Sequence, residues 1–369
     1  MNDEKTGVLH LTYDMRIGGT EMVIKSIIES SPKYIKPAIY CIESPLGPWG
    51  EELRDNGITI DGHARQPGFD WRLIWRLRSY IKKNKPQVIH CHQYTPWVYG
   101  TLASIGLGKN IIFTEHGRFY PDSTSWKRKF VNPVLRFFTK HITAISEATK
   151  NALVMYEFVP ADEIITIYNG IKKPNLTVSN ANDLRLQWNI PNNCKIVGTI
   201  ARLDPIKNQK MMLEAFKIVL VDDPQARLLI IGDGKERKNL EGICGKLNII
   251  NNVVFTGYDP KPLKYLALMD IFLLSSLSEG ASMTLVEAMA LSKPCVVTDA
   301  GGNAELIKDS FNGYVTSNDD SQKFADAILK LINNDALIAE FSQNSLLRYN
   351  TMFTDRQMVD QYCNLIRNH

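Results

Sequence analysis

Short apolar runs rich in β-branched residues alternate along this chain with longer amphipathic stretches. The apolar runs predict two series of strands, at 8–13, 38–43, 87–92, 110–116, 141–146 and 165–170, and then at 195–201, 226–232, 252–257, 271–276 and 294–299. Segments such as 71–84 and 208–222 lie between them and have the period of amphipathic helices. Strands that alternate with helices of this length predict parallel sheets covered on both faces. Two such series predict two Rossmann-like, doubly wound α/β domains.

The domain boundary is predicted from a change in composition. Residues 171–193 are rich in Pro, Asn and Lys and separate the two series of strands. At 369 residues and 44% hydrophobic content, the chain is long enough to fill two cores. We therefore expect domains at 1–175 and 176–345, followed by a C-terminal helix at 346–369.

Composition indicates the cellular compartment of the protein. The six cysteines are scattered singly, with no Cys/His cluster at metal-ligand spacing, which favours reduced thiols in the cytoplasm. The N-terminus lacks a basic secretory region, and no apolar run approaches the ~18 residues of a membrane span. We expect a cytoplasmic protein, at most peripheral on the inner face of the cytoplasmic membrane.

The net charge of +4 is unevenly distributed. Residues 1–175 contain 23 Lys and Arg against 17 Asp and Glu, a balance of +6, which leaves 20 against 22, or −2, for the remainder. A total of +4 without a basic nucleic-acid-binding motif argues against a nucleic-acid partner.

The loops that follow predicted strands are the first places to look for chemistry, because doubly wound sheets bind ligands at the carboxyl ends of their strands. After the first strand, Gly18 and Gly19 precede a helix that Thr20 or Glu21 opens, and free amides there can face an anion. The GxGxxG spacing of a dinucleotide fingerprint is absent. The alternative is that the two glycines only make a tight turn.

The first loop of the second series, in TIARLDPIKNQK, holds two cations. Arg202 and Lys207 lie five positions apart, just before a helix. Such cations can neutralise a diphosphate, because Arg offers a bidentate grip and Lys a point charge. The alternative is a solvated loop with two ordinary surface cations.

The stretch SLSEGASMTLVEAMA carries Glu279 and Glu287, eight positions apart. Ser282 can serve as the N-cap of the helix that follows, so that the amides of Met283 and Thr284 face a ligand. A carboxylate can accept two hydrogen bonds from the paired hydroxyls of a sugar or a ribose. The alternative makes Glu279 an exposed loop residue and Glu287 an acid favoured by the helix dipole.

These motifs together resemble family 4 of the retaining, GT-B-fold glycosyltransferases. The resemblance covers nearly the whole chain in the order of the family, and the Glu-x7-Glu element is its most specific part. It rests on GG at 18–19, EHG at 115–117, AISEATK at 144–150, YNGI at 168–171, ARLDPIKN at 201–208, IIGDGKE, FTGY, SEGASMTLVEAMA, KPCVVTDAGGNAELI and FNGYV. It implies two Rossmann-like domains facing a cleft, with the C-terminal helix crossing back to the first domain.

The resemblance also implies the reaction. The chain would transfer a hexose or N-acetylhexosamine from a nucleotide sugar to a saccharide or lipid-linked saccharide in surface polysaccharide biosynthesis. A UDP-sugar is the favoured donor and GDP-mannose the next. No cofactor is expected, and because no DxD stands in a suitable loop, no metal is either.

Residue roles follow from the same resemblance. Arg202 and Lys207 would hold the donor diphosphate, and Glu279 would contact the transferred sugar. His116 would lie beside that sugar, near the reacting centre. The amides of Ser282, Met283 and Thr284 would hold the distal phosphate, and Gly18 and Gly19 would approach the diphosphate. Glu287 would bind the ribose hydroxyls, and Tyr258 would contact the base. Gly280, Ala281 and Ser282 replace the Gly-Phe-Gly of many members, so the sugar pocket is expected to differ.

Other functions stay open at this point. Paired carboxylates also suit a retaining hydrolase, in which they lie about 5 Å apart. An epimerase on the same fold, or a catalytically idle module that binds a sugar nucleotide, are further alternatives.

One segment bears on a membrane partner. Residues 123–146 interleave aromatic residues with five cations and no acid, which suits an anionic membrane surface. The alternative is a packed helix whose aromatic residues belong to the core and whose cations are solvated.

Overall fold

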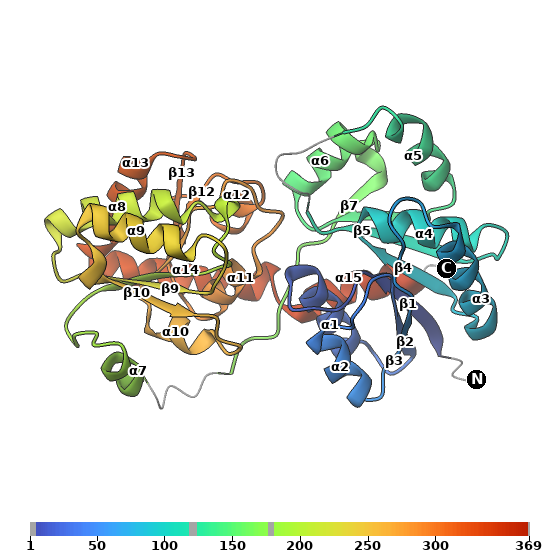
Figure 1. Cartoon of the computed structure of the whole chain (residues 1–369), viewed down its shortest axis with the longest axis horizontal. Helices are drawn as coiled ribbons and strands as arrows, with labels where there is room; N and C mark the ends of the chain where they lie inside the picture. The colour runs from blue at the N-terminus through green and yellow to red at the C-terminus, as the bar shows by residue number, and fades with distance from the viewer. Residues whose placement is uncertain (1–4, 118–123, 176–180, 368–369) are drawn as a thin grey trace. The chain divides into compact units, whose positions relative to one another are not determined.

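The computed structural model describes residues 5–117, 124–175 and 181–367. The chain divides into two compact units, which are described separately below. Unit 1 consists of Met1–Ile171 together with Asp355–His369, and unit 2 of Lys172–Thr354. Figure 1 shows the helices and strands by label.

Unit 1 contains a parallel sheet of seven strands among its described residues, in the order β3-β2-β1-β4-β5-β6-β7. Its strands are β1 (Thr6–Thr12), β2 (Ile35–Cys41), β3 (Thr59–Gly62), β4 (Val88–His92), β5 (Asn110–Glu115), β6 (His141–Ala144) and β7 (Ile164–Thr166). Its helices are α1 (Gly19–Ser30), α2 (Pro48–Asp55), α3 (Trp71–Asn84), α4 (Tyr94–Ser104), α5 (Arg128–Phe137), α6 (Glu147–Glu157) and α15 (Asp355–Arg367).

Unit 2 repeats the same plan with six strands in its described part, in the order β10-β9-β8-β11-β12-β13, all parallel. The strands are β8 (Ile196–Ile200), β9 (Arg227–Ile231), β10 (Val253–Gly257), β11 (Ile271–Leu274), β12 (Cys295–Thr298) and β13 (Gly313–Thr316). The helices are α7 (Ala181–Gln187), α8 (Gln209–Asp222), α9 (Arg237–Leu247), α10 (Leu263–Leu268), α11 (Met283–Ala290), α12 (Asn303–Leu306), α13 (Ser321–Ile332) and α14 (Asp335–Met352).

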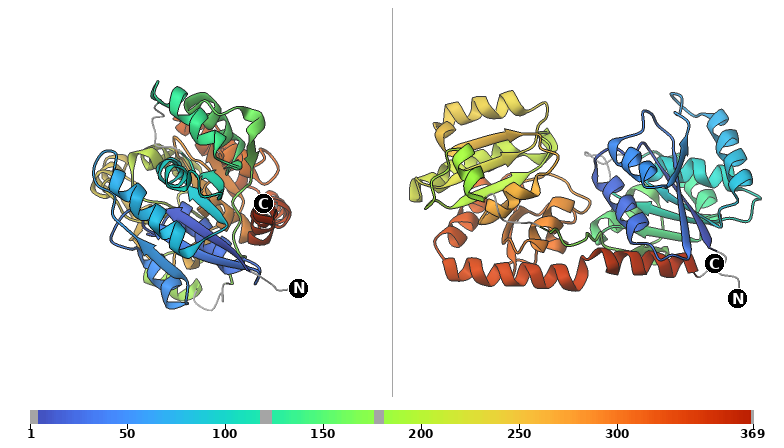
Figure 2. Two further views of the ribbon diagram at one scale, coloured as in Figure 1. Left: turned by 90° about the vertical axis from the view of Figure 1, so that its right-hand side faces the viewer. Right: turned by 90° about the horizontal axis from the view of Figure 1, so that it is seen from below.

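Both sheets therefore have the Rossmann strand order, as predicted, with helices on both faces (Figure 2). In each sheet the order reverses between two central strands, β1 and β4 in unit 1 and β8 and β11 in unit 2. Doubly wound sheets bind their ligands outside the carboxyl ends of the strands at this reversal. The fold thus singles out the loops after β1, β4, β8 and β11.

The cores follow from the side-chain pattern of the strands. In β1 and β4, alternate residues such as Leu9, Leu11 and Ile89 enter a large apolar cluster under α3 and α4. In unit 2, the helices α8, α9 and α13 pack on the sheet through a second cluster that includes Phe216 and Phe324. Because each unit buries its own core, each sheet holds its loops on a rigid base.

The end of the chain differs in detail from the expected single helix at 346–369. It forms two helices, α14, which belongs to unit 2, and α15, which belongs to unit 1 and contacts α1. The units divide after Ile171, and the chain re-enters unit 1 at Asp355. All six cysteines are buried and free of disulfides. Among the helices that the structure describes, none has the length and apolar character needed to cross a membrane.

Candidate active site

The reversal of strand order in unit 2 brings together two loops whose key residues, Lys207 and Glu279, are 72 positions apart in sequence. The loop after β8 carries Lys207, and the loop after β11 carries Glu279. The backbone amide of Leu277 donates to the carbonyl of Ile206 (2.8 Å), and Ser275 Oγ donates to the carbonyl of Lys207 (2.8 Å). These hydrogen bonds therefore hold the two loops together without a ligand.

Lys207 and Glu279 form the central contact of this site. Lys207 Nζ lies 2.5 Å from Glu279 Oε1, and Ser276 Oγ donates to the same oxygen at 2.6 Å. Both side chains are mostly buried, with 22% and 11% exposed. Since both contacts end on Oε1, and none of the described residues hydrogen-bonds Oε2, the second oxygen of Glu279 remains available to a ligand.

Two consecutive glycines, Gly301 and Gly302, lie against the backbone of Glu279. The amide of Gly302 donates to the Glu279 carbonyl at 3.1 Å. Gly301 has a φ of +55°, and a Cβ at this position would lie 1.9 Å from that carbonyl oxygen. Only glycine fits there, because any side chain would push the Glu279 loop away.

Helix α11 begins at Met283 beside this loop and carries Glu287 in its second turn. Ser282 occupies the predicted N-cap position, but its hydroxyl does not cap the helix and instead lies 3.1 Å from Thr284 Oγ1. Burial raises the pKa of Glu287 to about 7. No described residue forms an ion pair or a hydrogen bond with its carboxyl group, so Glu287 is a half-buried acid without a polar partner in the described part of the chain.

Arg202 and Tyr258, also expected at the donor site, lie at the carboxyl ends of β8 and β10. The Arg202 side chain is 72% exposed, with Asp204 3.7 Å away, and Tyr258 is 61% exposed. The loop of Arg202 is supported by Gly232, which has a φ of +132° and whose Cβ would lie 2.1 Å from the Ala201 carbonyl oxygen. The glycines of IIGDGKER thus brace the loop of Arg202 from the neighbouring strand.

In unit 1, Gly18 and Gly19 stand where they were expected, at the start of α1. The carboxyl group of Glu21 folds back over this turn, because a Cβ on Gly18 would lie 2.5 Å from Glu21 Oε2. Burial raises the pKa of Glu21 to about 7, and the charge of Asp14 adds to the effect. A carboxyl group that is partly protonated near neutral pH repels an anion at this turn less than an ordinary glutamate does.

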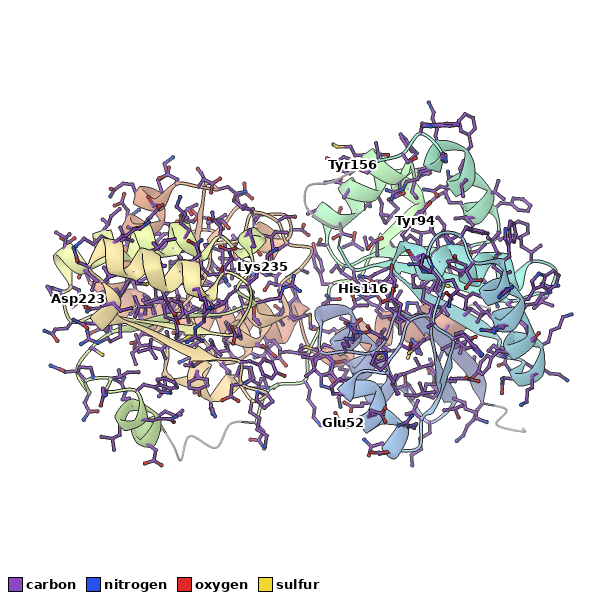
Figure 3. The ribbon with its side chains drawn as sticks, viewed as in Figure 1. Glu52, Tyr94, His116, Tyr156, Asp223 and Lys235 are labelled. Atoms are coloured by element: carbon purple, nitrogen blue, oxygen red, sulfur yellow. The ribbon has the colours of Figure 1, made fainter. Side chains whose placement is uncertain are left out.

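His116 directly follows β5, at the carboxyl end of that strand (Figure 3). Its Nε2 lies 2.9 Å from His92 Nδ1. Its Nδ1 is buried and has no hydrogen-bond partner among the residues that the structure describes. Burial lowers the pKa of His116 to about 3, so the ring is neutral at physiological pH.

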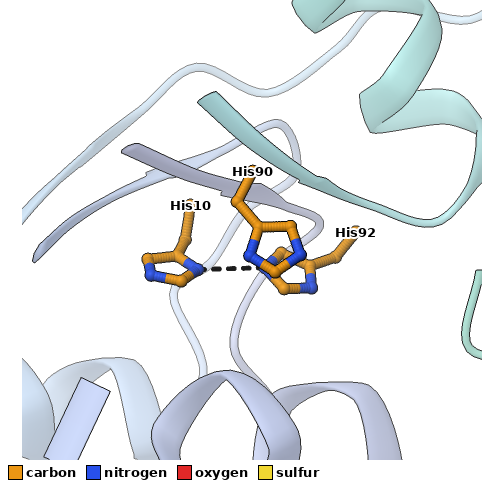
Figure 4. A group of neighbouring side chains, drawn as sticks. All are labelled: His10, His90 and His92. Carbon is orange, nitrogen blue, oxygen red and sulfur yellow. Dashed lines mark hydrogen bonds between the residues drawn. The ribbon is translucent and has the colours of Figure 1, made fainter. Parts of the chain in front are cut away.

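Three further histidines were missed by the sequence reasoning. His10 on β1 and His90 and His92 on β4 share one face of the sheet, because they occupy alternate strand positions and β1 pairs with β4 at His10 and His90. His10 Nδ1 lies 3.0 Å from His92 Nε2 (Figure 4). The signal was present in VLHLTY and QVIHCH, where histidines alternate with apolar residues in strands that are otherwise buried.

The basic aromatic segment forms a solvent-exposed helix, α5, rather than a part of the core. Only Asn132 and Leu135 of this helix are buried. Trp126, Phe130 and Phe137 are 71%, 67% and 83% exposed. The alternative in which these aromatic residues pack inside is therefore wrong. Residue 123 of the predicted segment lies outside the described residues, which resume at Thr124.

Comparison with known families agrees with this geometry. Residues 17–173 match the family model described as Glycosyltransferase Family 4, and residues 180–348 match the model described as Glycosyl transferases group 1. The two matches follow each other along almost the whole chain. The chain is a family 4 glycosyltransferase.

Curated relatives of this glycosyltransferase share about a quarter of its residues. N-acetyl-alpha-D-glucosaminyl L-malate synthase of Bacillus anthracis is 26% identical, over 83% of this chain and 81% of its own. Poly(ribitol-phosphate) alpha-N-acetylglucosaminyltransferase of Staphylococcus aureus is 25% identical, over 79% of this chain and 57% of its own. UDP-Gal:alpha-D-GlcNAc-diphosphoundecaprenol alpha-1,3-galactosyltransferase of Escherichia coli is 24% identical, over 74% of this chain and 73% of its own.

Solved structures show that the glycosyltransferase has the GT-B fold. HepE of Anabaena, solved in complex with UDP, has a TM-score of 0.87 at 22% identity, over 98% of this chain and 100% of that chain. TarM has a TM-score of 0.77 at 16% identity, over 99% and 100% of the two chains.

Proposed function

We propose that this glycosyltransferase moves a hexose or N-acetylhexosamine, with retention of configuration, from a nucleotide sugar to a saccharide or lipid-linked saccharide in surface polysaccharide biosynthesis. A UDP-sugar is the favoured donor and GDP-mannose the next. The observation that carries the proposal is the contact of Lys207 with Glu279 at the strand-order reversal of unit 2. It places a cation and a carboxylate with one free oxygen where doubly wound sheets bind nucleotides.

In the proposal, the cations of unit 2 bind the diphosphate of the donor. In the proposal, Lys207 turns from Glu279 toward a phosphate when the donor binds, and Arg202 joins it from the same loop. The amides of Ser282, Met283 and Thr284 at the start of α11 receive the distal phosphate, since a helix N-terminus favours an anion. These groups stabilise the charge that grows on the leaving diphosphate, a task for which the proposal needs no metal ion.

In the proposal, the two carboxylates bind the neutral parts of the donor, which are the transferred sugar and the ribose. Oε2 of Glu279 accepts from hydroxyls of the transferred sugar, while Oε1 stays with Ser276 and keeps the side chain oriented. Glu287 accepts from the two ribose hydroxyls, which supply the polar partners that its half-buried carboxyl group lacks among the described residues. Tyr258, which is exposed beside β10, is assigned to the base.

Unit 1 supplies the remaining groups of the proposal. His116 is assigned to the transferred sugar near the reacting centre, and the backbone of Gly18 and Gly19 to the diphosphate. In the retaining reaction, the acceptor hydroxyl attacks the face that the diphosphate leaves. Its proton passes to the leaving phosphate through an oxocarbenium-like transition state, so no side chain needs to act as a general base.

The names of the relatives support the donor and acceptor classes. Two of them are named for alpha-linked transfer of N-acetylglucosamine or galactose, and the Escherichia coli relative is named with UDP-Gal as donor and a diphosphoundecaprenol-linked sugar as acceptor. HepE has been solved with UDP-glucose bound.

Thermal unfolding in the presence of UDP, GDP, ADP and dTDP tests the donor site. A nucleotide at 100 times its dissociation constant should stabilise the folded protein by about 2.7 kcal/mol, and we expect UDP to give the largest rise in Tm. Lys207→Ala should abolish most of this rise, whereas Lys210→Ala, an exposed cation on α8, should preserve it. The proposal fails if no nucleotide changes the Tm of the wild-type protein.

We further propose that α5 docks the enzyme on an anionic membrane that carries the acceptor. Lys127 and Lys129 are exposed beside Trp126 and Phe130, so that cations and aromatic rings share one surface. Arg128 is engaged in an ion pair with Glu157 (2.6 Å) and Arg136 in one with Glu163, which hold the helix to α6 and the loop after it. Each cation near an anionic surface contributes ~1 kcal/mol, and the aromatic rings add interfacial burial.

Sedimentation with vesicles of phosphatidylglycerol or phosphatidylcholine tests this surface. Lys127→Glu with Lys129→Glu should lower binding to the anionic vesicles by at least tenfold, on ~1 kcal/mol per cation. The matched control, Lys82→Glu with Lys83→Glu at the exposed end of α3, should bind like the wild type. Equal sedimentation of both double variants would contradict the membrane role of α5.

A further inference from the structure

Four histidines of unit 1 take part in two separate hydrogen-bonded chains. One chain runs from His10 Nδ1 to His92 Nε2 (3.0 Å) and from His92 Nδ1 to His116 Nε2 (2.9 Å). We call these three residues the histidine ladder. The other chain joins His90 Nε2 to Thr114 Oγ1 at 2.7 Å. Figure 4 shows the His10–His92 contact, with the ring of His90 beside it.

The rings of the histidine ladder are neutral. His10 and His92 are almost completely buried in the sheet face, with 1% and 0% exposed. Burial lowers the pKa of His10 to about 4 and that of His92 well below its usual value, where the neighbouring histidines add to the effect. A neutral imidazole carries one N–H and one lone pair, so each ring can donate at one nitrogen only.

This restriction couples the three rings. Each contact of the ladder joins an Nδ1 to an Nε2, so one of the two atoms must carry the proton. If His116 donates from Nε2, then His92 accepts at Nδ1, donates from Nε2, and His10 accepts at Nδ1. All three rings are then Nε2–H tautomers. The reverse direction makes all three Nδ1–H tautomers, and a mixed set breaks at least one hydrogen bond.

We infer that His10 and His92 are positioning residues that fix the tautomer of His116. The other nitrogen of His116, Nδ1, is buried and has no partner among the described residues. The ladder couples the state of this atom, a lone pair or an N–H, to the tautomers of His10 and His92. It therefore also couples to them whether His116 accepts a hydrogen bond from a sugar hydroxyl or donates one to it. The catalytic consequence rests on the proposed function, whereas the coupling of the rings does not.

His90 offers a matched comparison within the same sheet face. Thr143 Oγ1 donates to the carbonyl of Phe113 (3.2 Å), so it can accept from Thr114 Oγ1, 2.6 Å away. Thr114 then accepts from His90 Nε2–H. His90 is as buried as His10 but hydrogen-bonds outside the ladder. Its loss removes a buried imidazole without changing the partners of His116.

Nitrogen NMR of the full-length protein labelled with 15N-histidine tests the coupling directly. The chemical shifts distinguish a nitrogen that carries a proton from one with a lone pair, and single substitutions assign the rings. We expect His10, His92 and His116 to have the same tautomer in the wild-type protein. In His10→Leu, we expect His116 to populate both tautomers, and in His90→Leu to keep the wild-type one. A mixed set of tautomers in the wild type would overturn the inference.

Kinetics then separate positioning from a purely structural role. An imidazole held in the wrong tautomer can lose about 10⁴-fold in kcat, so the partial loss of control in His10→Leu should cost at least tenfold. KM for the donor should stay unchanged, because Lys207 and Glu287 bind it. His10→Asn, whose amide can replace Nδ1, should restore much of kcat and also serves if His10→Leu does not fold. Equal kcat in His10→Leu and His90→Leu would overturn the positioning role.

Metal content provides a separate check. The ring nitrogens of His10, His90 and His92 lie within 4.8 Å of one another, close enough to share a cation. A ladder of hydrogen bonds predicts no stoichiometric metal in the purified protein and no change of these resonances on adding Zn²⁺. A bound metal that shifts the His10 and His92 signals would replace the ladder and overturn the inference. These outcomes do not depend on whether the enzyme accepts a UDP-sugar.

Discussion

Two glutamates of one motif have opposite surroundings. Glu279 is held by Lys207 and Ser276, whereas Glu287 has no polar partner among the described residues and its pKa is raised to about 7 by burial. The spacing of the motif predicts that both carboxylates belong to one site. It did not reveal the ion pair, because the contact of Lys207 with Glu279 depends on β8 lying beside β11.

The raised pKa of Glu287 predicts how donor binding depends on pH. Below a pH of about 7 the carboxyl group is largely protonated, and above it the carboxylate can accept from both ribose hydroxyls. Binding should therefore tighten by about tenfold between pH 6 and pH 8, since one pKa unit corresponds to a tenfold change in ionised fraction below the midpoint. Calorimetry with a UDP-sugar measures this, because its diphosphate diester has no proton that titrates in this range.

Two variants separate this effect from other titrating groups. Glu287→Gln should bind more weakly and without the rise between pH 6 and pH 8. Glu21→Gln should keep or enlarge the rise, because ionisation of Glu21, whose pKa is also raised to about 7, would repel the diphosphate. The same rise in Glu287→Gln as in the wild type would contradict the role of Glu287.

At the scale of elements, the sequence predicted the central strands and missed the edges. The apolar runs located the strands of both reversals to within a few residues, and 71–84 matches α3 at both ends. The missed strands, β3 and β13, are four-residue edge strands. An edge strand buries less apolar surface than a central one, so its sequence resembles a loop. The exposure of α5 likewise could not be read from its composition.

The histidine ladder was hidden for a related reason. His10 and His92 stand in strands that are otherwise largely apolar, and His116 directly follows another such strand, so each run reads as an ordinary buried strand. Only the pairing of β1 with β4 and of β4 with β5 brings the rings to one face. Such a network depends on contacts between strands that are distant in sequence, which hydrophobic periodicity does not report.

The glycine behind Glu279 gives a prediction about elements. Gly301→Ala places a methyl group against the Glu279 carbonyl in a backbone conformation with φ of +55°. We expect a loss of about 1–3 kcal/mol in the free energy of unfolding, together with weaker donor binding. Gly242→Ala, in α9 with open space around it, should instead stabilise by up to about 1 kcal/mol. Chemical denaturation measures both changes, and an unaltered Gly301→Ala would show that the loop can shift freely.

At the scale of the whole molecule, the two Rossmann-like domains followed from the two series of strands, whereas the GT-B fold and the return of the last helix to unit 1 were implied by the family resemblance alone. The point at which the chain leaves unit 2 could not be predicted from periodicity, because α14 and α15 follow each other with only Phe353 and Thr354 between them. The last helix is part of unit 1, where Tyr362 lies against the ring of His90 with 5.1 Å between centroids. The end of the chain thus covers the face of the sheet that carries the ladder.

The central claim is retaining transfer from a nucleotide sugar, and proton NMR of the product tests it most directly. The enzyme is incubated with UDP-N-acetylglucosamine or UDP-galactose and a polyprenyl-diphosphate-linked saccharide, and the anomeric signal of the new linkage is followed. The account predicts an α-linked product and release of UDP, with the rate lowered by ~10²-fold or more in Lys207→Ala. A β-linked product, or free sugar released at the same rate with and without the acceptor, would contradict it.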